Sequence, residues 1–430
     1  MRAPPSTPSP AIAPHDGGVR SSSRAAVVVA IALAVIGIVV AIVFVPWEAD
    51  VAPWATLQIP AALDFFTEQQ RADIAAYVDA AWLPGLLSVV AGPVLALVVL
   101  ASARLRRSLS RVGPRERPVI RDFLAGFALI LATRLVALPF DVWLAVVRRD
   151  NGLLIEPWGT WLLRWSGTAL VIALLGALAV TLALGIVRRW PRRGWIAVVA
   201  GAAVAVAAVS LVVPFVNVVD GTRSDPLVRD RVLAIAKDAG VEVGDVVVVD
   251  VADRSPVLNA TVSGWGPTRT VTLYDTLLTT ATPEQVDAIV AHELVHVRDN
   301  DVVLGTALAM LGAAVVVSIG LALAMSPGVR QRLGVRGRAD TPLVALLVAV
   351  VLAGTVVALP VSATISRAIE ARADRDAVAI TGDPAAYADL IALLAVTNRS
   401  TLEPPPWRYA LFFTHPTPLQ RIAATATPPS

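Results

Sequence analysis

The sequence contains no cysteine and only four histidines among its 430 residues. Without cysteine the chain can form neither disulfide bonds nor thiolate metal sites, so any metal bound by its side chains must be held by histidine and carboxylate groups. Charged residues are also scarce, at 16% of the chain, whereas 56% of the residues are hydrophobic and the mean hydropathy is +0.70. These proportions exceed the apolar share of an ordinary soluble domain and indicate an integral membrane protein.

The small positive charge of the chain comes almost entirely from arginine. The arginines concentrate in short segments between apolar stretches, which suits orientation in a membrane better than binding to nucleic acid. We therefore expect a lipid bilayer, and no nucleic acid, among the partners of this chain.

Seven stretches of the sequence are long and apolar enough to cross a bilayer. They lie near residues 25–45, 82–102, 123–147, 161–187, 195–218, 302–325 and 342–365. The first is interpreted as an uncleaved membrane anchor, because it is long and no clear small-residue cleavage site follows it. The sequence thus predicts a mainly α, polytopic membrane protein with about seven transmembrane helices.

These stretches divide the chain into five regions. They are a disordered Pro/Ser-rich tail (1–24), five transmembrane helices with Arg-rich cytoplasmic loops (25–218), a small α+β unit (219–301), transmembrane helices six and seven (302–365) and a C-terminal region (366–430). We expect the C-terminal region to complete the α+β unit, so that one functional unit is split in the sequence by two spans.

Two predicted spans contain residues that are unusual inside a membrane. Arg134 lies within 123–147, and Arg164 lies near the start of 161–187. Such charges usually face a protein interior or a wet cavity, and Arg164 is equally compatible with the membrane interface. Pro139 leaves open that 123–147 is broken or re-entrant, although the charge pattern of the loops favours a full crossing.

The loops alternate in charge along the chain. Arginines cluster in the second, fourth and sixth loops: Arg104, Arg106, Arg107, Arg111, Arg115, Arg117, Arg121; Arg188, Arg189, Arg192, Arg193; Arg330, Arg332, Arg336, Arg338. The loop after the first span is instead acidic. The positive-inside rule then places the N-terminus in the cytoplasm, and the Arg-rich, Lys-poor composition suggests a bacterial plasma membrane. An odd number of spans puts 219–301 and 366–430 together on the extracytoplasmic side.

The segment 219–301 has the pattern of a soluble α+β unit. Apolar residues at helical spacing predict a helix over 226–239. Runs of β-branched residues predict strands at 241–250, 257–263 and 269–275, the last two joined as a hairpin by the turn at 264–267.

The sharpest motif of the chain is Ala-His-Glu-Leu-Val-His at residues 291–296. A start signal resembling a capping box at Thr282 predicts that the motif lies on a helix. His292 and His296 then stack on one helix face, about 6 Å apart along the axis. Two imidazoles in this arrangement can bind one Zn²⁺, and the adjacent Glu293 can take a proton from water. The alternative is a surface helix with incidental histidines.

A third ligand must come from another part of the chain. Glu370 and Asp374 are four residues apart on a helix that is predicted to continue out of the seventh span. One carboxylate can complete a His₂Glu site, and the other can accept a hydrogen bond from a ligating histidine. The alternative is an exposed helix that pairs Arg367, Arg372 and Arg375 with its own acids. A His-Glu-x-x-His helix on the same membrane face favours ligation.

Four motifs follow one another in the second half of the chain. They are Asn259-Ala260 with Val-Thr-Leu-Tyr-Asp-Thr-Leu-Leu at 271–278, His-Glu-Leu-Val-His at 292–296, Glu-Ala-Arg-Ala-Asp at 370–374, and His-Pro-Thr-Pro-Leu-Gln-Arg-Ile at 415–422. In this order, with two spans between the second and third, they resemble the type I CAAX prenyl endopeptidase family of integral-membrane zinc peptidases, which is related to the HtpX-type bacterial membrane proteases.

The resemblance implies a membrane-embedded zinc metalloendopeptidase that hydrolyses peptide bonds with one Zn²⁺ per chain. The implied zinc ligands are His292, His296 and Glu370. The implied general base is Glu293, and Asp374 is implied to support a ligand histidine during catalysis.

The resemblance also implies three residues that act on the substrate. Asn259 would hold the backbone of an extended peptide, and His415 and Arg421 would contact the substrate or the developing oxyanion. From the residues alone, a histidine before a proline is more often a helix-entry or loop residue, and Arg421 is equally a structural ion-pair partner.

Two other classes of function are compatible with a metal site in a membrane protein. A zinc transporter would place its ligands near the middle of the bilayer, whereas these lie at the ends of spans. A non-catalytic zinc sensor would not need Glu293. The eukaryotic relatives act on the cytosolic side, whereas the loop charges place this site outside, so we expect a peptide or a membrane protein as substrate rather than a farnesylated cytosolic protein.

The topology can be tested with a fluorescent protein fused after Ser430. We expect this fusion to stay dark, because the arginine pattern and the odd number of spans export the C-terminus, where such a reporter does not mature. Strong fluorescence would contradict the predicted orientation and return cytosolic substrates to consideration.

Overall fold

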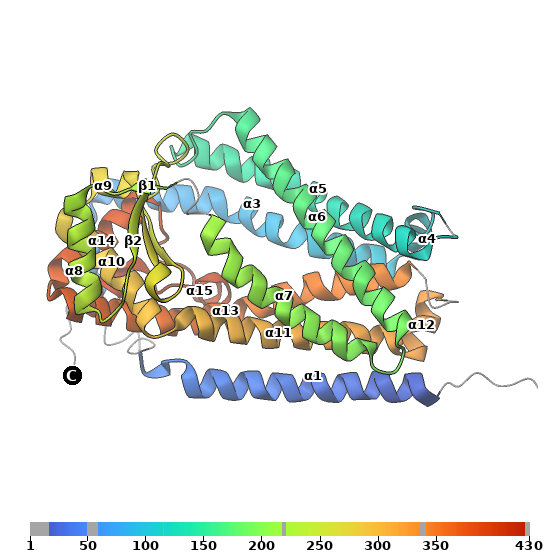
Figure 1. Ribbon diagram of the computed structural model, residues 1–430. Helices are drawn as coiled ribbons and strands as arrows, with labels where there is room; N and C mark the ends of the chain where they lie inside the picture. The colour runs from blue at the N-terminus through green and yellow to red at the C-terminus, as the bar shows by residue number, and fades with distance from the viewer. Residues whose placement is uncertain (1–16, 50–58, 115, 217–220, 336–340, 426–430) are drawn as a thin grey trace, which may run out of the picture.

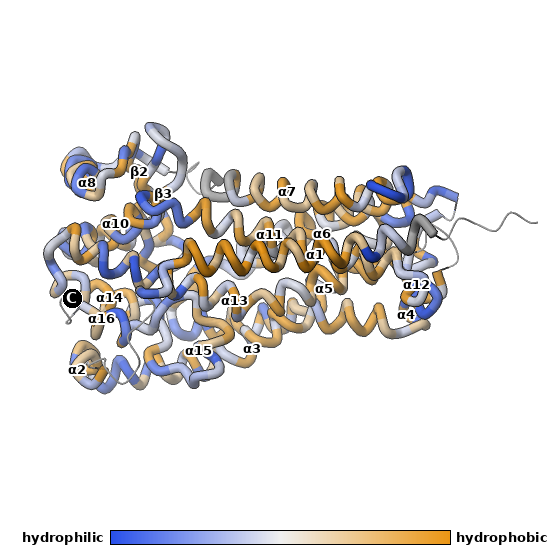
Figure 2. Tube along the Cα trace, turned by 90° about the horizontal axis from the view of Figure 1, so that it is seen from below, coloured by the Kyte–Doolittle hydropathy of each residue, from blue (hydrophilic) through white to orange (hydrophobic). Residues whose placement is uncertain are grey.

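A computed structural model describes residues 17–49, 59–114, 116–216, 221–335 and 341–425 of the chain. Its long helices lie side by side as a bundle, and the sheet and most of the short helices gather at one end of that bundle (Figure 1). Hydrophilic residues concentrate at the two ends, with hydrophobic residues between them (Figure 2). This distribution is typical of a protein that spans a bilayer.

Seven long helices form the bundle in the described part of the chain. They are α1 (Gly17–Phe44), α3 (Glu68–Ala101), α5 (Pro118–Asp150), α6 (Trp158–Arg189), α7 (Gly194–Val216), α11 (Asp301–Met325) and α13 (Pro342–Thr381). Over the described residues, all except α7 are long and apolar enough to cross a membrane, which makes six candidate spans. The seventh long helix, α7, coincides with the predicted fifth span. The mainly helical, polytopic fold predicted from the sequence is therefore confirmed.

The first helix starts earlier than the sequence suggested. Residues 17–24, which we predicted to belong to the disordered tail, are helical, and that prediction was wrong for them. The Ser23 hydroxyl donates to the carbonyl oxygen of Ala322 on α11 at 3.0 Å. The helix therefore packs against α11 from its first turns, a contact that its polar residues do not reveal in the sequence. Residues 1–16 lie outside the described residues.

Helices α3 and α5 also extend beyond the predicted spans. α3 begins at Glu68, where Thr67 and Gln70 form a capping box in which each side chain accepts a hydrogen bond from the other residue's main-chain N–H. α5 is one continuous helix across Pro139. The alternative of a broken or re-entrant third span is therefore wrong.

The two arginines of the spans have different environments. Arg134 lies 3.6 Å from Asp141 on the same helix, and Asp141 also accepts a hydrogen bond from Ser88 of α3. Arg134 thus faces the protein interior, which is one of the environments expected for a charged residue within a span. Arg164 pairs with Glu156, just before α6 begins, while more than half of its side chain stays exposed. Its position agrees with the interface alternative.

A four-stranded sheet lies at one end of the bundle (Figure 1). Its strands are β1 (Thr222–Arg223), β2 (Asp245–Val249), β3 (Ala260–Ser263) and β4 (Thr270–Tyr274). The order is β1-β2-β4-β3, with β2 and β4 parallel and the other pairs antiparallel. The three predicted strands and the hairpin are present, each strand being shorter than its β-branched run, and β3 is an edge strand.

Most of the remaining helices lie at the same end of the bundle as the sheet (Figure 1). They are α8 (Pro226–Asp238), α9 (Asp275–Thr280), α10 (Pro283–Arg298), α14 (Pro384–Thr397), α15 (Pro406–Phe412), α16 (Pro418–Thr425), the short α2 (Ile59–Leu63) and the 3₁₀ helices η1 (Trp47–Ala49) and η2 (Gly266–Thr268). One hydrophobic core that includes Leu273, Leu294, Leu390 and Leu419 joins the sheet, α10, α14 and α16. At the opposite end of the bundle lie α4 (Ala103–Leu109) and α12 (Pro327–Leu333), both rich in arginine (Figure 1).

Two glycines of α3 test how closely the helices of the bundle pack. A Cβ at Gly92 would lie 3.0 Å from the carbonyl oxygen of Thr133 on α5, whereas a Cβ at Gly85 would meet no atom within 4 Å. We expect Gly92→Leu to destabilise the protein by about 1–3 kcal/mol through overpacking. Gly85→Leu, on the same helix, is the control and should have little effect. Thermal unfolding in detergent measures both, and equal melting temperatures for the two variants would contradict the packing.

Candidate active site

The His-Glu-x-x-His motif lies on α10, whose start agrees with the sequence signal. Thr282 accepts a hydrogen bond from the N–H of Gln285 at 3.3 Å, and the Gln285 side chain accepts one from the N–H of Thr282 at 2.9 Å. The apolar face of the helix, with Leu294 fully buried, packs into the core. This packing fixes the rotation of α10 and directs His292 and His296 toward α13.

Glu370 and Asp374 lie on the part of α13 that extends beyond the apolar bundle. They are 9% and 4% exposed, so the alternative of an exposed, self-paired helix is wrong. Two arginines of this helix contact other elements instead. Arg367 donates to two main-chain carbonyl oxygens at the end of α15, and Arg372 pairs with Asp301 at the start of α11.

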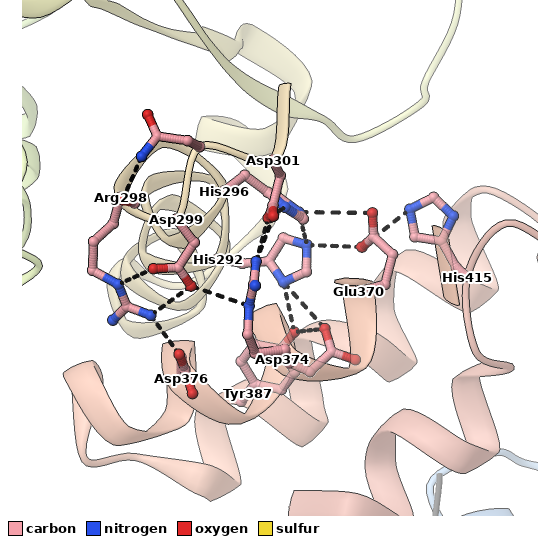
Figure 3. A network of polar contacts seen from close by, with 12 residues as sticks. His292, His296, Arg298, Asp299, Asp301, Glu370, Asp374, Asp376, Tyr387 and His415 are labelled. Atoms are coloured by element: carbon pink, nitrogen blue, oxygen red, sulfur yellow. Dashed lines mark hydrogen bonds and ion pairs between the residues drawn. The ribbon is translucent and has the colours of Figure 1, made fainter. Parts of the chain in front are cut away.

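Two imidazole nitrogens of α10 and the Glu370 carboxylate of α13 lie close together (Figure 3). The Nε2 atoms of His292 and His296 are 3.2 Å apart. One Glu370 oxygen lies 3.1 Å from the first of these nitrogens, and its other oxygen lies 3.6 Å from the second. The structure thus brings together the three residues that the sequence predicted as ligands.

The geometry of this triangle fits a single metal ion. Two ligands about 2.1 Å from a tetrahedral ion lie about 3.4 Å from each other. The separation of the two nitrogens, and the distance from each nitrogen to its nearer Glu370 oxygen, lie close to that value. A cation between the atoms would also satisfy two imidazole nitrogens that otherwise face each other. Two nitrogens and one carboxylate form a set that zinc accepts while keeping a fourth position open.

The other ring nitrogen of His292 contacts a network of buried polar groups (Figure 3). Its Nδ1 lies 3.1 Å from Asp374 and 3.2 Å from the Tyr387 hydroxyl, which donates to the same carboxylate at 2.5 Å. Arg421 donates to both oxygens of Asp374, at 2.9 and 2.7 Å. A carboxylate that accepts the Nδ1–H leaves the Nε2 lone pair free for a metal, so Asp374 can position His292.

A different carboxylate, that of Asp301, can position His296. The Nδ1 of His296 lies 2.8 Å from Asp301, which is 7% exposed and accepts two hydrogen bonds from Arg372 at 2.6 Å. Arg372 also pairs with Asp299 at 3.0 Å. Both histidines are therefore held by a carboxylate that is itself paired with an arginine.

The site favours positive charge between its histidines and carboxylates. Burial opposes the charging of His296, but its hydrogen bonds with Asp301 and Glu370 outweigh that effect and raise its pKa to about 10. The pKa of His292 is also raised, since Asp374 and Glu370 outweigh its burial. A divalent cation can supply this positive charge while the rings remain neutral ligands.

A cavity of about 150 Å³ opens beside the donor atoms, and several predicted site residues line it. Glu293 and His292 line it from α10, and Asn259 lines it from the start of the edge strand. Arg421 and His415 line it from the C-terminal segment; the His415 side chain is 54% exposed, with its Nε2 3.4 Å from Glu370. Burial raises the pKa of the Glu293 carboxyl. All eight residues predicted from the sequence thus lie at or around one site.

Three residues of the site were not predicted from the sequence. Tyr387 and Asp301 contact the two histidines, and Arg372 holds Asp301. Asp301 follows the motif helix so closely that a search for carboxylates near the predicted ligands would have found it. Nothing in the local pattern around Tyr387 distinguishes it from a core aromatic residue, since it is brought to the site by the packing of α14 on α10.

Comparison with known proteins agrees with this arrangement. The sequence profile of Peptidase family M48 matches residues 222–428, which contain the sheet, the motif helix and the rest of the site. This segment belongs to peptidase family M48. The protein is a metalloendopeptidase embedded in a membrane, and the resemblance to the type I CAAX prenyl endopeptidases predicted from its motifs is confirmed.

Two relatives extend the likeness beyond this segment. The uncharacterized metalloprotease YhfN of Bacillus subtilis (strain 168) is 25% identical over 313 residues, covering 69% of this chain and 71% of YhfN. The crystal structure of S. mikatae Ste24p superposes with a TM-score of 0.74 over 97% of this chain and 100% of Ste24p, at 17% identity. The bundle and the site-bearing unit of the metallopeptidase therefore share one fold with Ste24p.

The carboxylate behind His296 provides a test of the site. We expect Asp301→Asn to weaken binding of a divalent metal by about 10- to 100-fold, because the amide no longer holds the ring as a carboxylate does. Titration of metal-free protein with Co²⁺, followed by its visible absorption, measures the affinity. Asp299→Asn is a matched control that also loses a pairing with Arg372 but does not contact the ring. Equal affinities of the two variants would contradict a positioning role for Asp301.

Proposed function

We propose that the protein is a zinc metalloendopeptidase whose single Zn²⁺ is held by His292, His296 and Glu370. The observation that carries the proposal is the convergence of two imidazole nitrogens, 3.2 Å apart, with the two oxygens of the Glu370 carboxylate, 3.1 and 3.6 Å from them, beside a cavity that Glu293 also lines. Nitrogen and carboxylate ligands in this number are those of catalytic zinc sites, in which a fourth position stays open. Zinc bound there would polarise the scissile carbonyl and lower the pKa of a water to about 7.

Glu293 is proposed as the general base. It follows His292 on α10 and lines the same cavity, so its carboxylate can reach the space that a water and the scissile bond would share. Burial raises its pKa and makes it a stronger base. After it has taken a proton from water, the same carboxyl can deliver that proton to the leaving amine.

His415 is proposed to act on the substrate and Arg421 to position Asp374. The exposed ring of His415 lies beside Glu370 and can donate a hydrogen bond to the developing oxyanion. Arg421 instead directs its donors to Asp374 and the Tyr387 hydroxyl. Of the two alternatives that the sequence left open for Arg421, these contacts favour the ion pair.

An extended peptide is the proposed substrate, paired with the edge strand β3. The carbonyl oxygen of Asn259 accepts a hydrogen bond from the N–H of Tyr274 on β4, so the main chain here continues the antiparallel ladder beside the cavity. Peptides bind sheet edges by adding a strand, with main-chain hydrogen bonds supplying affinity. The membrane around the bundle makes membrane proteins natural substrates as well.

The site is further proposed to lie outside the cytoplasm of a bacterial cell. The Arg-rich helices α4 and α12 lie at the opposite end of the bundle from the sheet and α10 (Figure 1). If arginine-rich loops stay in the cytoplasm, the metal site is extracytoplasmic. The position of the ligands at the end of the bundle also disfavours a transporter, which would bind its ion near the middle of the membrane.

The proposal predicts a specific loss of activity for Glu293→Gln. We expect peptide cleavage to fall by about 10²- to 10⁴-fold, because an amide cannot accept the proton. The bound zinc, about one per chain, should remain, since the substitution leaves the three ligands intact. Cleavage of a quenched fluorescent peptide and elemental analysis of the purified protein measure the two properties.

Glu284→Gln serves as the control for this experiment. Glu284 lies on the same helix, exposed and paired with Arg231, so its replacement should change neither activity nor metal content. Full activity of Glu293→Gln would refute the proposed base, and a wild-type protein that binds zinc but cleaves no peptide would favour a sensor.

A further inference from the structure

The main chain just before β3 is contacted by a side chain from α14. The Asn398 amide lies at the end of that helix, where its Oδ1 accepts a hydrogen bond from the N–H of Leu258 at 3.1 Å. Its Nδ2 donates to the carbonyl oxygen of the same residue at 3.3 Å. One side chain therefore satisfies both main-chain groups of Leu258, as a paired strand would.

The direction of these groups follows from the register of β3 and β4. Asn259 accepts a hydrogen bond from Tyr274, so this pair is a hydrogen-bonded pair of the antiparallel ladder. Because such pairs alternate with non-bonded ones, Leu258, Ala260 and Val262 direct their N–H and C=O groups away from β4, toward the outer edge. Asn398 occupies the first of these three positions.

We propose that Asn398 is a specificity-determining residue that ends the substrate-binding edge at Leu258. A peptide added as a strand would pair with Val262 and then with Ala260, which is 1% exposed without a peptide, and its pairing would stop where the Asn398 amide already holds the main chain of Leu258. Asn398 also lines the cavity that contains His292 and Glu293, so the stop lies on the metal side of the edge. This inference rests on the proposed peptidase function and adds a limit to the length of the paired substrate.

A series of peptides lengthened two residues at a time, at either end, tests the limit. For the wild-type enzyme, kcat/KM should stop rising once the position opposite Ala260 is filled. In Asn398→Ala the N–H and C=O groups of Leu258 lose their partner. A peptide that is two residues longer at one end can then pair with them, which should raise kcat/KM by about two- to tenfold. Asn398→Asp keeps an oxygen that accepts from the Leu258 N–H but loses the amide that donates to the Leu258 carbonyl. Its gain in kcat/KM with the longer peptide should therefore be smaller than that of Asn398→Ala.

Asp389→Ala is the matched control, since Asp389 is an exposed polar residue of the same helix. It should show the length dependence of the wild type. N-methylated peptides extend the test to the unmutated enzyme: methylation of the amides opposite Ala260 and Val262 should lower kcat/KM, whereas methylation two residues beyond, opposite Leu258, should not.

The outcomes separate this inference from the proposed function. If the wild-type enzyme cleaves no peptide at all, the peptidase proposal fails. If it cleaves peptides but wild type and Asn398→Ala share one length profile, or the amide opposite Leu258 is sensitive to methylation, only the limit at Asn398 is refuted. A change of oligomeric state in Asn398→Ala with unchanged cleavage would show that the edge pairs with a second copy instead.

Discussion

The approach of the Glu370 carboxylate to two imidazole nitrogens is the contact on which the rest of the site depends. Those groups come from α10 and α13, and the span of α11 and the apolar part of α13 itself lie between them in the sequence. When both Nδ1 atoms donate to their carboxylates, the two Nε2 lone pairs lie 3.2 Å apart, and a positive charge between them is favourable. The arrangement persists because each helix is fixed by other contacts: α10 by its apolar face in the core, and α13 by the bundle on one side and by its arginines on the other.

The charges around the site are arranged in layers. Nearest the donor atoms are buried carboxylates, which favour a cation. Behind two of them lie arginines, Arg421 on Asp374 and Arg372 on Asp301. A buried carboxylate without a partner would tend to take up a proton and lose its hold on the imidazole. The arginines therefore satisfy these carboxylates with charged hydrogen bonds, and they do so from segments that are distant in the chain. This arrangement explains why α16 and the start of α11 belong to the site although neither supplies a proposed ligand.

The membrane fold and the functional unit share a single long helix. α13 runs for 40 residues from the apolar bundle to the end of the site. Its first part, including Val344 and Ala345, is fully buried among other spans, and its last part presents Glu370. A displacement of the bundle would thus move Glu370, a proposed metal ligand. The same helix holds α15 through Arg367, and α15 leads directly to His415, so the substrate side of the cavity is tied to it as well.

How far the sequence predicted these features depends on whether their cause is local. The spans, the helix of the His-Glu-x-x-His motif and the hairpin follow from apolar periodicity, caps and turn residues, all of which act within a few neighbours. The first turns of α1 and the early start of α3 were missed, the former because it is stabilised by α11 rather than by its own polar residues.

The sequence by itself determined which residue types could bind a metal, since the chain has no cysteine and few histidines, and it determined their spacing on each helix. Only the tertiary structure decided that Glu370 completes the triangle while Asp374 contacts the opposite ring nitrogen, because both share one helix face and the rotation of α13 selects between them. Tyr387, Asp301 and Asn398 likewise gained their roles through packing. Hydrogen bonds between segments far apart in the chain leave no periodic signal, since their geometry is set by how whole helices are placed against one another.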